Sequence, residues 1–247
     1  MKKLSWRSIA AICLLSLSAF FYMIDYIFTG SWRHIMSSLL DNVAFVFIYI
    51  FLAALVIETL LQKNEKKNKM EKLNMVIGVF FNEAGSKLLL YFSKLDKSLD
   101  SMRGELHVTG KWNDMSFAEA GKKILNYKYE LQISPADLEE ISGFLIGERD
   151  FLLRLLENPI LLEHETFTEL LMAVFHLADE FANRQDFNSL PESDRKHLEG
   201  DIRRAYDLAI REWLVYMKYL KTSYPYLFSL AIRTNPFDKN AKVIISQ

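Results

Sequence analysis

The residues best able to do chemistry are histidines and carboxylates in the second half of the chain. His176 and Glu180 are four residues apart, a spacing that places both side chains on one face of a helix, and His197 and Asp201 repeat it. Imidazole nitrogens and carboxylate oxygens bind zinc and related metal ions. A metal site is therefore one hypothesis for this chain.

The candidate metal set from the sequence is His164, Glu169, His176 and Glu180. Neither the Glu-x-x-His pairs of carboxylate-bridged di-iron bundles nor a His-Glu-x-x-His motif occurs. With five histidines in 247 residues, such spacings also arise by chance. We therefore assign no metal ligand and expect no cofactor, and a metal protein or enzyme using these residues stays an alternative.

Other catalytic chemistry has less support. The only cysteine, Cys13, lies inside an apolar run, and a Gly-x-Ser-x-Gly nucleophile motif is absent from the sequence. Neither of the common glycine-rich phosphate-binding loops occurs. We predict no catalytic residue.

Two long apolar runs lie near the N-terminus. Ile9–Phe28 has 20 residues and Val43–Leu61 has 19. As helices each extends roughly 30 Å, the thickness of the hydrocarbon core of a bilayer. Trp6 and Trp32 flank the first run as interfacial aromatics do. We predict a two-helix transmembrane hairpin over residues 1–61, with buried core helices or a cleaved signal peptide as alternatives.

Basic residues predict the orientation of this hairpin. Arg33 is the only lysine or arginine in the loop that connects the two runs. Positive charge otherwise precedes the first run and follows the second, as Lys2, Lys3, Arg7, Lys63, Lys66, Lys67, Lys69 and Lys72. By the positive-inside rule both termini are cytoplasmic. Cleavage of the first run would leave the large domain on the same side.

Two ionisable residues fall inside the apolar runs, Asp25 and Glu58. Each lies roughly 10 Å from the centre of its run, close enough to a bilayer surface for the carboxylate to reach water. In an antiparallel hairpin the two lie near opposite surfaces and do not pair. The alternative is an oligomeric pore or transport accessory lined by Ser16, Ser18 and Asp25.

Residues 62–247 form the second predicted domain. Four of the 30 basic and three of the 31 acidic residues lie before position 62, so the remaining charge is nearly balanced. This balance gives no electrostatic reason to expect nucleic acid as a partner. The hydrophobic periodicity is helical almost throughout, so the predicted fold class is all-α, a cytoplasmic helical bundle behind the hairpin.

Capping and breaking residues divide this domain into five or six helices. The first continues from Gln62 to Leu95, with an apolar stripe that needs a partner surface. A loop over Arg103–Met115 precedes a capping box at Ser116. The other expected helices run from Ser134 to just before Pro159, from Glu165 to Ala182, from Pro191 to Pro225, and from there through Ile232.

The C-terminal stretch from Tyr219 to Asp238 is rich in aromatic residues around two prolines. Such residues either close the end of the helical core or form a docking surface, because aromatics and arginine dominate interface hot spots. The possible docking residues are Tyr224, Tyr226, Phe228, Arg233 and Phe237.

Several segments resemble an uncharacterised family of prokaryotic membrane proteins with the same two-span start. They are Leu155–Pro159, Leu162–Glu165, Ala173–Leu177, Leu190–Ala205 and Tyr224–Phe237. The resemblance covers most of the chain and implies the cytoplasmic membrane of a prokaryotic cell. It implies no activity, substrate or site residue.

The leading hypothesis from the sequence is a non-enzymatic, membrane-anchored interaction or scaffold module. An anchor, a helical bundle and an aromatic-rich end are present without the residues of a recognisable active site. Besides the lipid bilayer, the expected partner is another protein or further copies of the same chain.

Overall fold

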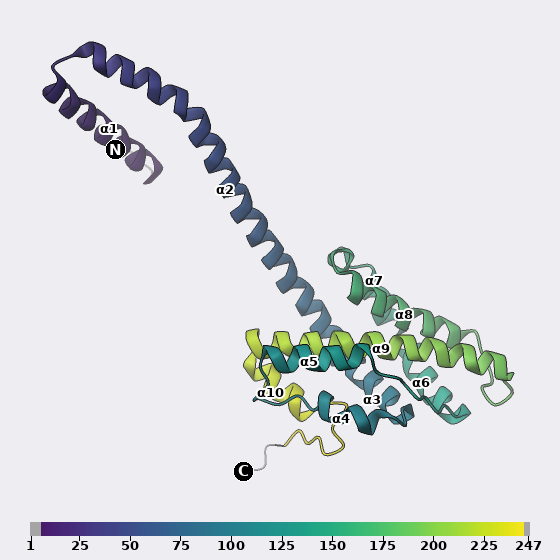
Figure 1. Cartoon of the computed structure of the whole chain (residues 1–247). Helices are drawn as coiled ribbons and strands as arrows, with labels where there is room; N and C mark the ends of the chain where they lie inside the picture. Colours follow the sequence, from purple (N-terminus) through teal and green to yellow (C-terminus); the bar gives the residue numbers. More distant parts are fainter. Residues whose placement is uncertain (1–5, 245–247) are drawn as a thin grey trace, which may run out of the picture. The chain divides into compact units, whose positions relative to one another are not determined.

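The computed structural model describes residues 6–244, which are almost entirely helical (Figure 1). Within this range the only β contact is an isolated bridge between Asp96 and Leu131. The all-α fold class is therefore confirmed. The α-helices of the described residues are α1 (Trp6–Thr29), α2 (Trp32–Phe80), α3 (Ser86–Leu95), α4 (Leu99–Leu106), α5 (Asp114–Leu125), α6 (Pro135–Gly147), α7 (Arg149–Leu156), α8 (Glu165–Ala182), α9 (Glu192–Ser223) and α10 (Pro225–Arg233).

The chain divides into two compact units, and α2 contributes to both. The first unit, Met1–Lys66, is called the apolar hairpin below. The second, Lys67–Gln247, is called the helical domain.

A glycine joins the two helices of the apolar hairpin. Gly30 has a φ of +61°, a left-handed conformation that glycine adopts without steric cost. Its N–H donates to the carbonyl oxygen of Tyr26 at 2.9 Å, which ends α1. Close to the turn, the rings of Tyr26 and Trp32 are 6.3 Å apart and the amide of Asn42 donates to the hydroxyl of Tyr22. The turn thus fixes a helical hairpin in this unit.

Most apolar side chains of the hairpin are exposed within the chain itself; Leu15 and Phe47, for example, are 71% and 72% exposed. Two helices are long and apolar enough to cross a membrane, one over Ala11–Thr29 and one within Trp32–Leu95. A signal sequence or the core helix of a soluble protein meets the same criteria of length and composition.

A π-helical turn over Phe81–Gly85 separates α2 from α3. The backbone N–H of Ser86 donates to the carbonyl oxygen of Phe81, five residues back, which widens the helix. A Cβ at Gly85 would lie 2.6 Å from a ring carbon of Phe80 and 2.7 Å from one of Phe81. The prediction of one regular helix up to Leu95 is wrong here, because the aromatic packing around Gly85 is a tertiary feature.

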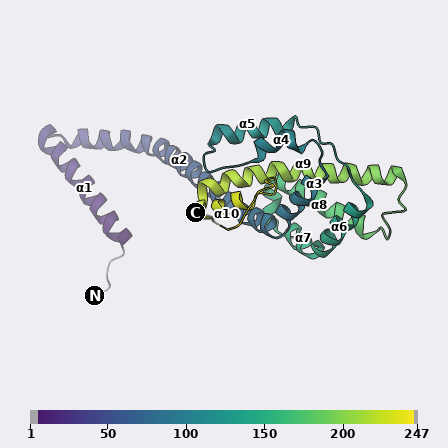
Figure 2. The ribbon, with the colours of Figure 1, turned by 90° about the horizontal axis from the view of Figure 1, so that it is seen from below.

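The apolar stripe predicted along this segment is buried, as expected. Leu73, Ile77, Phe80, Ala84 and Leu88 are each at most 2% exposed. The central helix of this domain is α9, which contacts α3, α5, α8 and α10 (Figures 1 and 2). A single apolar core therefore fills the helical domain around α9.

Local capping signals place several helix ends. Ser134 and Asp137 form a reciprocal capping box at the start of α6, with Pro135 as its first residue, as predicted. The capping box expected at Ser116 is displaced: Asn113 is the N-cap of α5, and Ser116 is the residue that reaches back to it. The predicted helix start at Ser116 is therefore wrong by three residues, because Asn113 takes the N-cap position and Ser116 is its partner in the box.

Two other segments also depart from the sequence-based expectation. The helix predicted from Ser134 to Pro159 is interrupted at Glu148, which separates α6 from α7. The loop predicted over Arg103–Met115 begins later, because α4 extends to Leu106. Leu106 and Val108 are buried, so core packing orders a segment whose glycines suggested a loop.

Candidate metal centre

The candidate site lies where α8 and α9 run side by side near the loop that joins them. These two helices have the most extensive mutual contact in the helical domain. α8 presents His176 and Glu180 near its C-terminal end, and α9 presents His197 and Asp201 near its N-terminal end. In each pair the four-residue spacing places both side chains on one helical face. The antiparallel connection brings the two faces together.

Each of the two imidazoles lies close to both carboxylates. The Nε2 atom of His176 lies 3.7 Å from Oε1 of Glu180 and 3.6 Å from Oδ2 of Asp201. The Nε2 atom of His197 lies 3.7 Å from Oε2 of Glu180 and 3.3 Å from the same Oδ2 of Asp201. Ligand atoms of His176, Glu180 and His197 all fall within 4.8 Å of one another. We call these four residues the His–carboxylate cluster.

Burial differs across the cluster. The side chain of Asp201 is only 6% exposed, whereas those of His176 and His197 are about half exposed. The Oδ2 atom of Asp201 is buried and has no hydrogen-bond partner in the described residues. Buried carboxylate oxygens are almost always satisfied, because burying an unpaired charge is costly. The groups that face Oδ2 are the imidazoles of His197 and His176, at 3.3 and 3.6 Å.

Arg184 holds Glu180 in place from the other side. Its Nη1 donates to Oε2 of Glu180 at 2.5 Å, and its Nε and Nη2 form a bidentate pair with Asp194 at 2.8 and 2.7 Å. The hydrogen bond from Arg184 lowers the pKa of Glu180, against the opposing effect of burial. The same guanidinium lowers the pKa of Asp194. Glu180 is thus kept ionised, the state in which a carboxylate binds a cation.

The structure separates His164 and Glu169, the other two candidates from the sequence, from this cluster. The Nδ1 atom of His164 accepts the backbone N–H of Phe167 at 3.1 Å, so His164 is the N-cap of α8. Glu169 is exposed on the same helix. Of the set His164, Glu169, His176 and Glu180, only the last two meet. Their partners are His197 and Asp201. The sequence shows that this second pair has the same four-residue spacing, but it does not show that α8 and α9 pack against each other.

The five possible docking residues divide into two groups. Phe228 and Phe237 are buried, and the ring of Phe237 packs 5.0 Å from that of Trp213. Tyr226 is 71% exposed, and Tyr224 and Arg233 are half-buried. Phe228 and Phe237 thus close the core, whereas Tyr226 lies on an exposed surface.

The two ionisable residues of the apolar runs have only local contacts. The backbone carbonyl of Asp25 accepts the hydroxyl of Thr29, and the carboxylate of Glu58 accepts the amide of Gln62. Both partners lie four residues further along the same helix.

A second buried carboxylate provides a contrast with Asp201. Asp96 accepts hydrogen bonds from Tyr127, from the backbone N–H of Glu130, and from both the backbone and hydroxyl of Ser98. These bonds tie the start of α4 to the segment after α5. Asp96 is therefore held by several hydrogen bonds within the fold, whereas Oδ2 of Asp201 forms none and lies beside two imidazoles.

These features define an all-helical protein with an apolar N-terminal hairpin and a separate helical domain that carries a His–carboxylate cluster. The chain belongs to the family of the uncharacterized protein MJ1433. The family's N-terminal helical domain matches residues 2–61, and its C-terminal helical domain matches residues 69–233.

One relative is the "Uncharacterized protein MJ1433" of Methanocaldococcus jannaschii, 46% identical over 239 residues, covering 97% of this chain and 96% of the relative. No solved structure matches the chain significantly. The expected resemblance to an uncharacterised family is therefore confirmed. The relative comes from an archaeon.

Proposed function

We propose that this chain is a membrane-anchored protein whose helical domain binds a divalent transition-metal ion between α8 and α9. The observation that carries the proposal is Oδ2 of Asp201, buried without a hydrogen-bond partner and facing the imidazoles of His176 and His197. This departs from the sequence-based expectation of no cofactor.

The donor set favours zinc-like ions. Two imidazoles and two carboxylates suit Zn²⁺, Fe²⁺ or Mn²⁺, whereas Ca²⁺ and Mg²⁺ prefer oxygen ligands alone. Around an ion with ligand distances of about 2.0–2.2 Å, neighbouring atoms of a tetrahedron lie about 3.3–3.6 Å apart. The four nitrogen–oxygen distances are 3.3, 3.6, 3.7 and 3.7 Å, and the two to Glu180 involve different oxygens, Oε1 toward His176 and Oε2 toward His197. A tetrahedral shell would form when side-chain rotations bring one oxygen of Glu180 and one of Asp201 to the same ion as the two imidazoles.

Four protein ligands leave no open position on a tetrahedral ion, which is characteristic of structural rather than catalytic sites. His176 and Glu180 hold the ion from α8, and His197 and Asp201 hold it from α9. The ion would tie the two helices together beside their connecting loop. This agrees with the expectation of a non-enzymatic module.

Elemental analysis tests the metal site. The full-length protein, purified in detergent and stripped with a chelator, is dialysed separately against Zn²⁺, Fe²⁺ and Mn²⁺. We expect stoichiometric uptake, Zn²⁺ most tightly, with His197→Ala and Asp201→Asn each losing the ion. His107→Ala is the matched control, because His107 is an exposed histidine beside Asp238, outside the cluster. Equal uptake by His197→Ala and the wild type would contradict the proposal.

The membrane anchor is supported by the length and exposure of the two apolar helices and by the basic residues around them. We place both termini on the cytoplasmic side of a prokaryotic membrane. Extraction of isolated membranes with alkaline carbonate tests insertion, and a reporter fused after Gln247 tests orientation. Release into the soluble fraction, or a reporter active outside the cell, would exclude this arrangement.

A second candidate function is binding of a protein partner or of further copies of the chain. The favouring observation is the exposed apolar side of α10, where Tyr226 and Leu230 are 71% and 43% exposed. Crosslinking in intact membranes followed by mass spectrometry tests it. Recovery of monomer alone, without a reproducible partner, would count against it.

A further inference from the structure

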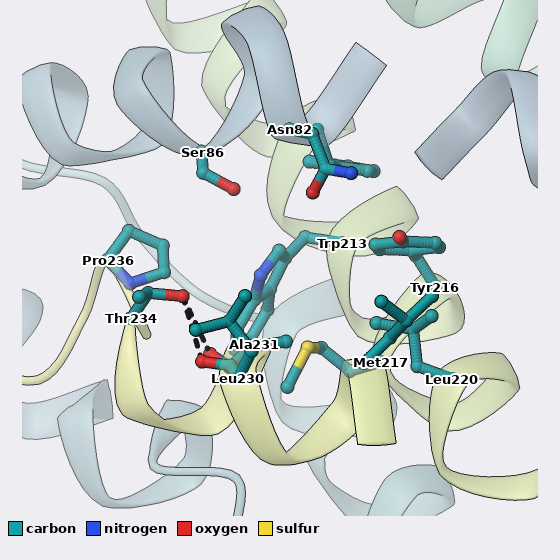
Figure 3. Close-up of a pocket in the computed structure, with 12 residues that line it drawn as sticks. Asn82, Ser86, Trp213, Tyr216, Met217, Leu220, Leu230, Ala231, Thr234 and Pro236 are labelled. Carbon is teal, nitrogen blue, oxygen red and sulfur yellow. Dashed lines mark hydrogen bonds between the residues drawn. The ribbon is translucent and has the colours of Figure 1, made fainter. Parts of the chain in front are cut away.

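A groove lined mainly by apolar residues lies between the C-terminal end of α2 and α10. None of its lining residues belongs to the His–carboxylate cluster. The groove consists of two adjoining cavities of about 210 and 370 Å³ over α9, which share Asn82, Tyr216, Leu220 and Leu227. We call it the α10 groove. Figure 3 shows the first cavity, with Asn82 and Ser86 on one wall and Trp213, Tyr216 and Met217 on the other.

The walls of the α10 groove are uncharged. Among the described residues, neither cavity is lined by an acidic or basic side chain, and most of the surface is aromatic or aliphatic. An apolar cavity of about 150 Å³ is enough to bind benzene. The two adjoining cavities thus have room for a molecule of about two rings. The absence of a counter-charge favours a neutral occupant.

Several buried polar groups in these walls have no protein partner. Asn74, Trp213 and Tyr216 are 7%, 2% and 6% exposed, and none of their side chains makes a hydrogen bond within residues 6–244. The hydroxyl of Tyr216 lies against Gly78, where an added Cβ would come within 3.0 Å of it. Burial raises the pKa of Tyr216 without any compensating hydrogen bond. The polar atoms of these three side chains are not fully enclosed, so water or a bound molecule is able to satisfy them.

The π-helical turn supplies the opposite wall. It places Asn82 and Ser86 toward the cavity (Figure 3), and neither side chain has a hydrogen-bond partner in the described residues. π-helical turns inside α-helices occur frequently at functional sites, because the widened turn redirects side chains. The indole, hydroxyl and amide groups around the groove are all able to donate hydrogen bonds. They fit an occupant that carries an oxygen acceptor.

We propose that the α10 groove binds an uncharged, mainly apolar molecule of about two rings that bears a carbonyl or hydroxyl oxygen. The apolar walls enclose the body of the molecule, and Tyr216, which lines both cavities, donates to its oxygen. This site is separate from the His–carboxylate cluster and does not depend on the metal.

Photo-crosslinking with benzophenone tests the proposal. This probe is uncharged, has two rings and a carbonyl oxygen, and forms adducts with nearby C–H bonds, readily with methionine. The full-length protein in detergent is irradiated at increasing probe concentrations, and the adducts are located by peptide mass spectrometry. We expect saturable labelling at Met217, which lines the first cavity and is fully buried. The exposed Met115 and Met172 lie outside its lining and report non-specific labelling.

Two variants and one analogue sharpen the test. Tyr216→Phe removes one hydrogen-bond donor and should raise the half-saturating concentration about two- to tenfold. Ala231→Trp fills the first cavity and should abolish labelling of Met217, with circular dichroism confirming the fold. The anion 4-benzoylbenzoate should not label the groove. Labelling of Met115 and Met172 equal to that of Met217, or labelling that does not saturate, would overturn the proposal.

Discussion

Arg184 and Asp194 face one another across the connection between α8 and α9, joined by two hydrogen bonds of 2.8 and 2.7 Å. The side chain of Arg184 is only 16% exposed, and the same guanidinium reaches Glu180. A planar bidentate pair of this kind fixes geometry as well as charge. Arg184 therefore links the closure of the loop to the position of a proposed metal ligand.

Replacing Arg184 with glutamine should weaken metal binding without removing any ligand. Loss of a group that orients a metal ligand typically costs about 10- to 100-fold in affinity. We expect this range for Zn²⁺, measured by competition with a chromophoric chelator. Arg203→Gln is the control, since Arg203 pairs with Glu199 on the outer side of α9. A variant of Arg184 that binds Zn²⁺ like the wild type would show that Glu180 needs no positioning.

Removing the hydroxyl of Tyr206 should stabilise the protein. This hydroxyl is fully buried and has no hydrogen-bond partner among the described residues. Burial of an unsatisfied polar group costs about 1–3 kcal/mol, and Tyr206→Phe relieves that cost. In contrast, Tyr129→Phe should destabilise by about 1 kcal/mol, because its hydroxyl donates to Asp207 at 2.9 Å. Denaturant unfolding of both variants measures the two opposite changes; a loss of stability in Tyr206→Phe would refute the first.

Stability should fall as the pH rises above about 10. Burial raises the pKa of the hydroxyls of Tyr127, Tyr129 and Tyr206 above that of an exposed tyrosine. Above about pH 10 the unfolded chain loses these protons while the folded chain retains them, so unfolding becomes more favourable. The stabilising contribution of these three protonated hydroxyls is fully present below about pH 10 and is lost progressively above it. Unfolding free energies at pH 8 and pH 11 measure the slope, which Tyr206→Phe should reduce.

An alanine at Gly85 should destabilise the helical domain. Its Cβ would lie 2.6 Å from a ring carbon of Phe80, so the fully buried aromatic rings of the π-helical turn would have to move. Overpacking of this kind typically costs about 1–3 kcal/mol. Gly143→Ala in α6 is the matched control, because its Cβ meets nothing within 4 Å. There we expect a gain of about 0.5–1 kcal/mol, since alanine favours a helix over glycine. Equal unfolding midpoints for the two variants would contradict this account of the turn.

Short-range features were predictable from the sequence. The bounds of α8 and the start of α6 follow from apolar periodicity and from capping residues such as Ser134. The break before α10 follows from Pro225, which cannot continue α9 as a regular helix. These signals act within a few residues, so the chain displays them before it folds.

The departures occur where packing overrides local preference. Gly104 suggested a loop, yet it lies in α4, whose residues Met102 and Leu106 are buried. The π-helical turn has no local signal, because Phe80 and Phe81 would suit a regular helix equally well. Only the burial of both rings against the rest of the core selects it.

By itself, the sequence determined the helical class, the apolar hairpin and the two four-residue pairs of histidine and carboxylate. The tertiary structure decided which pairs meet: it joined His176 and Glu180 to His197 and Asp201, and left His164 as a helix cap. The physical reason is range. A helical spacing fixes the face on which a side chain lies, but the packing of α8 against α9 through their whole apolar surfaces decides which faces come together.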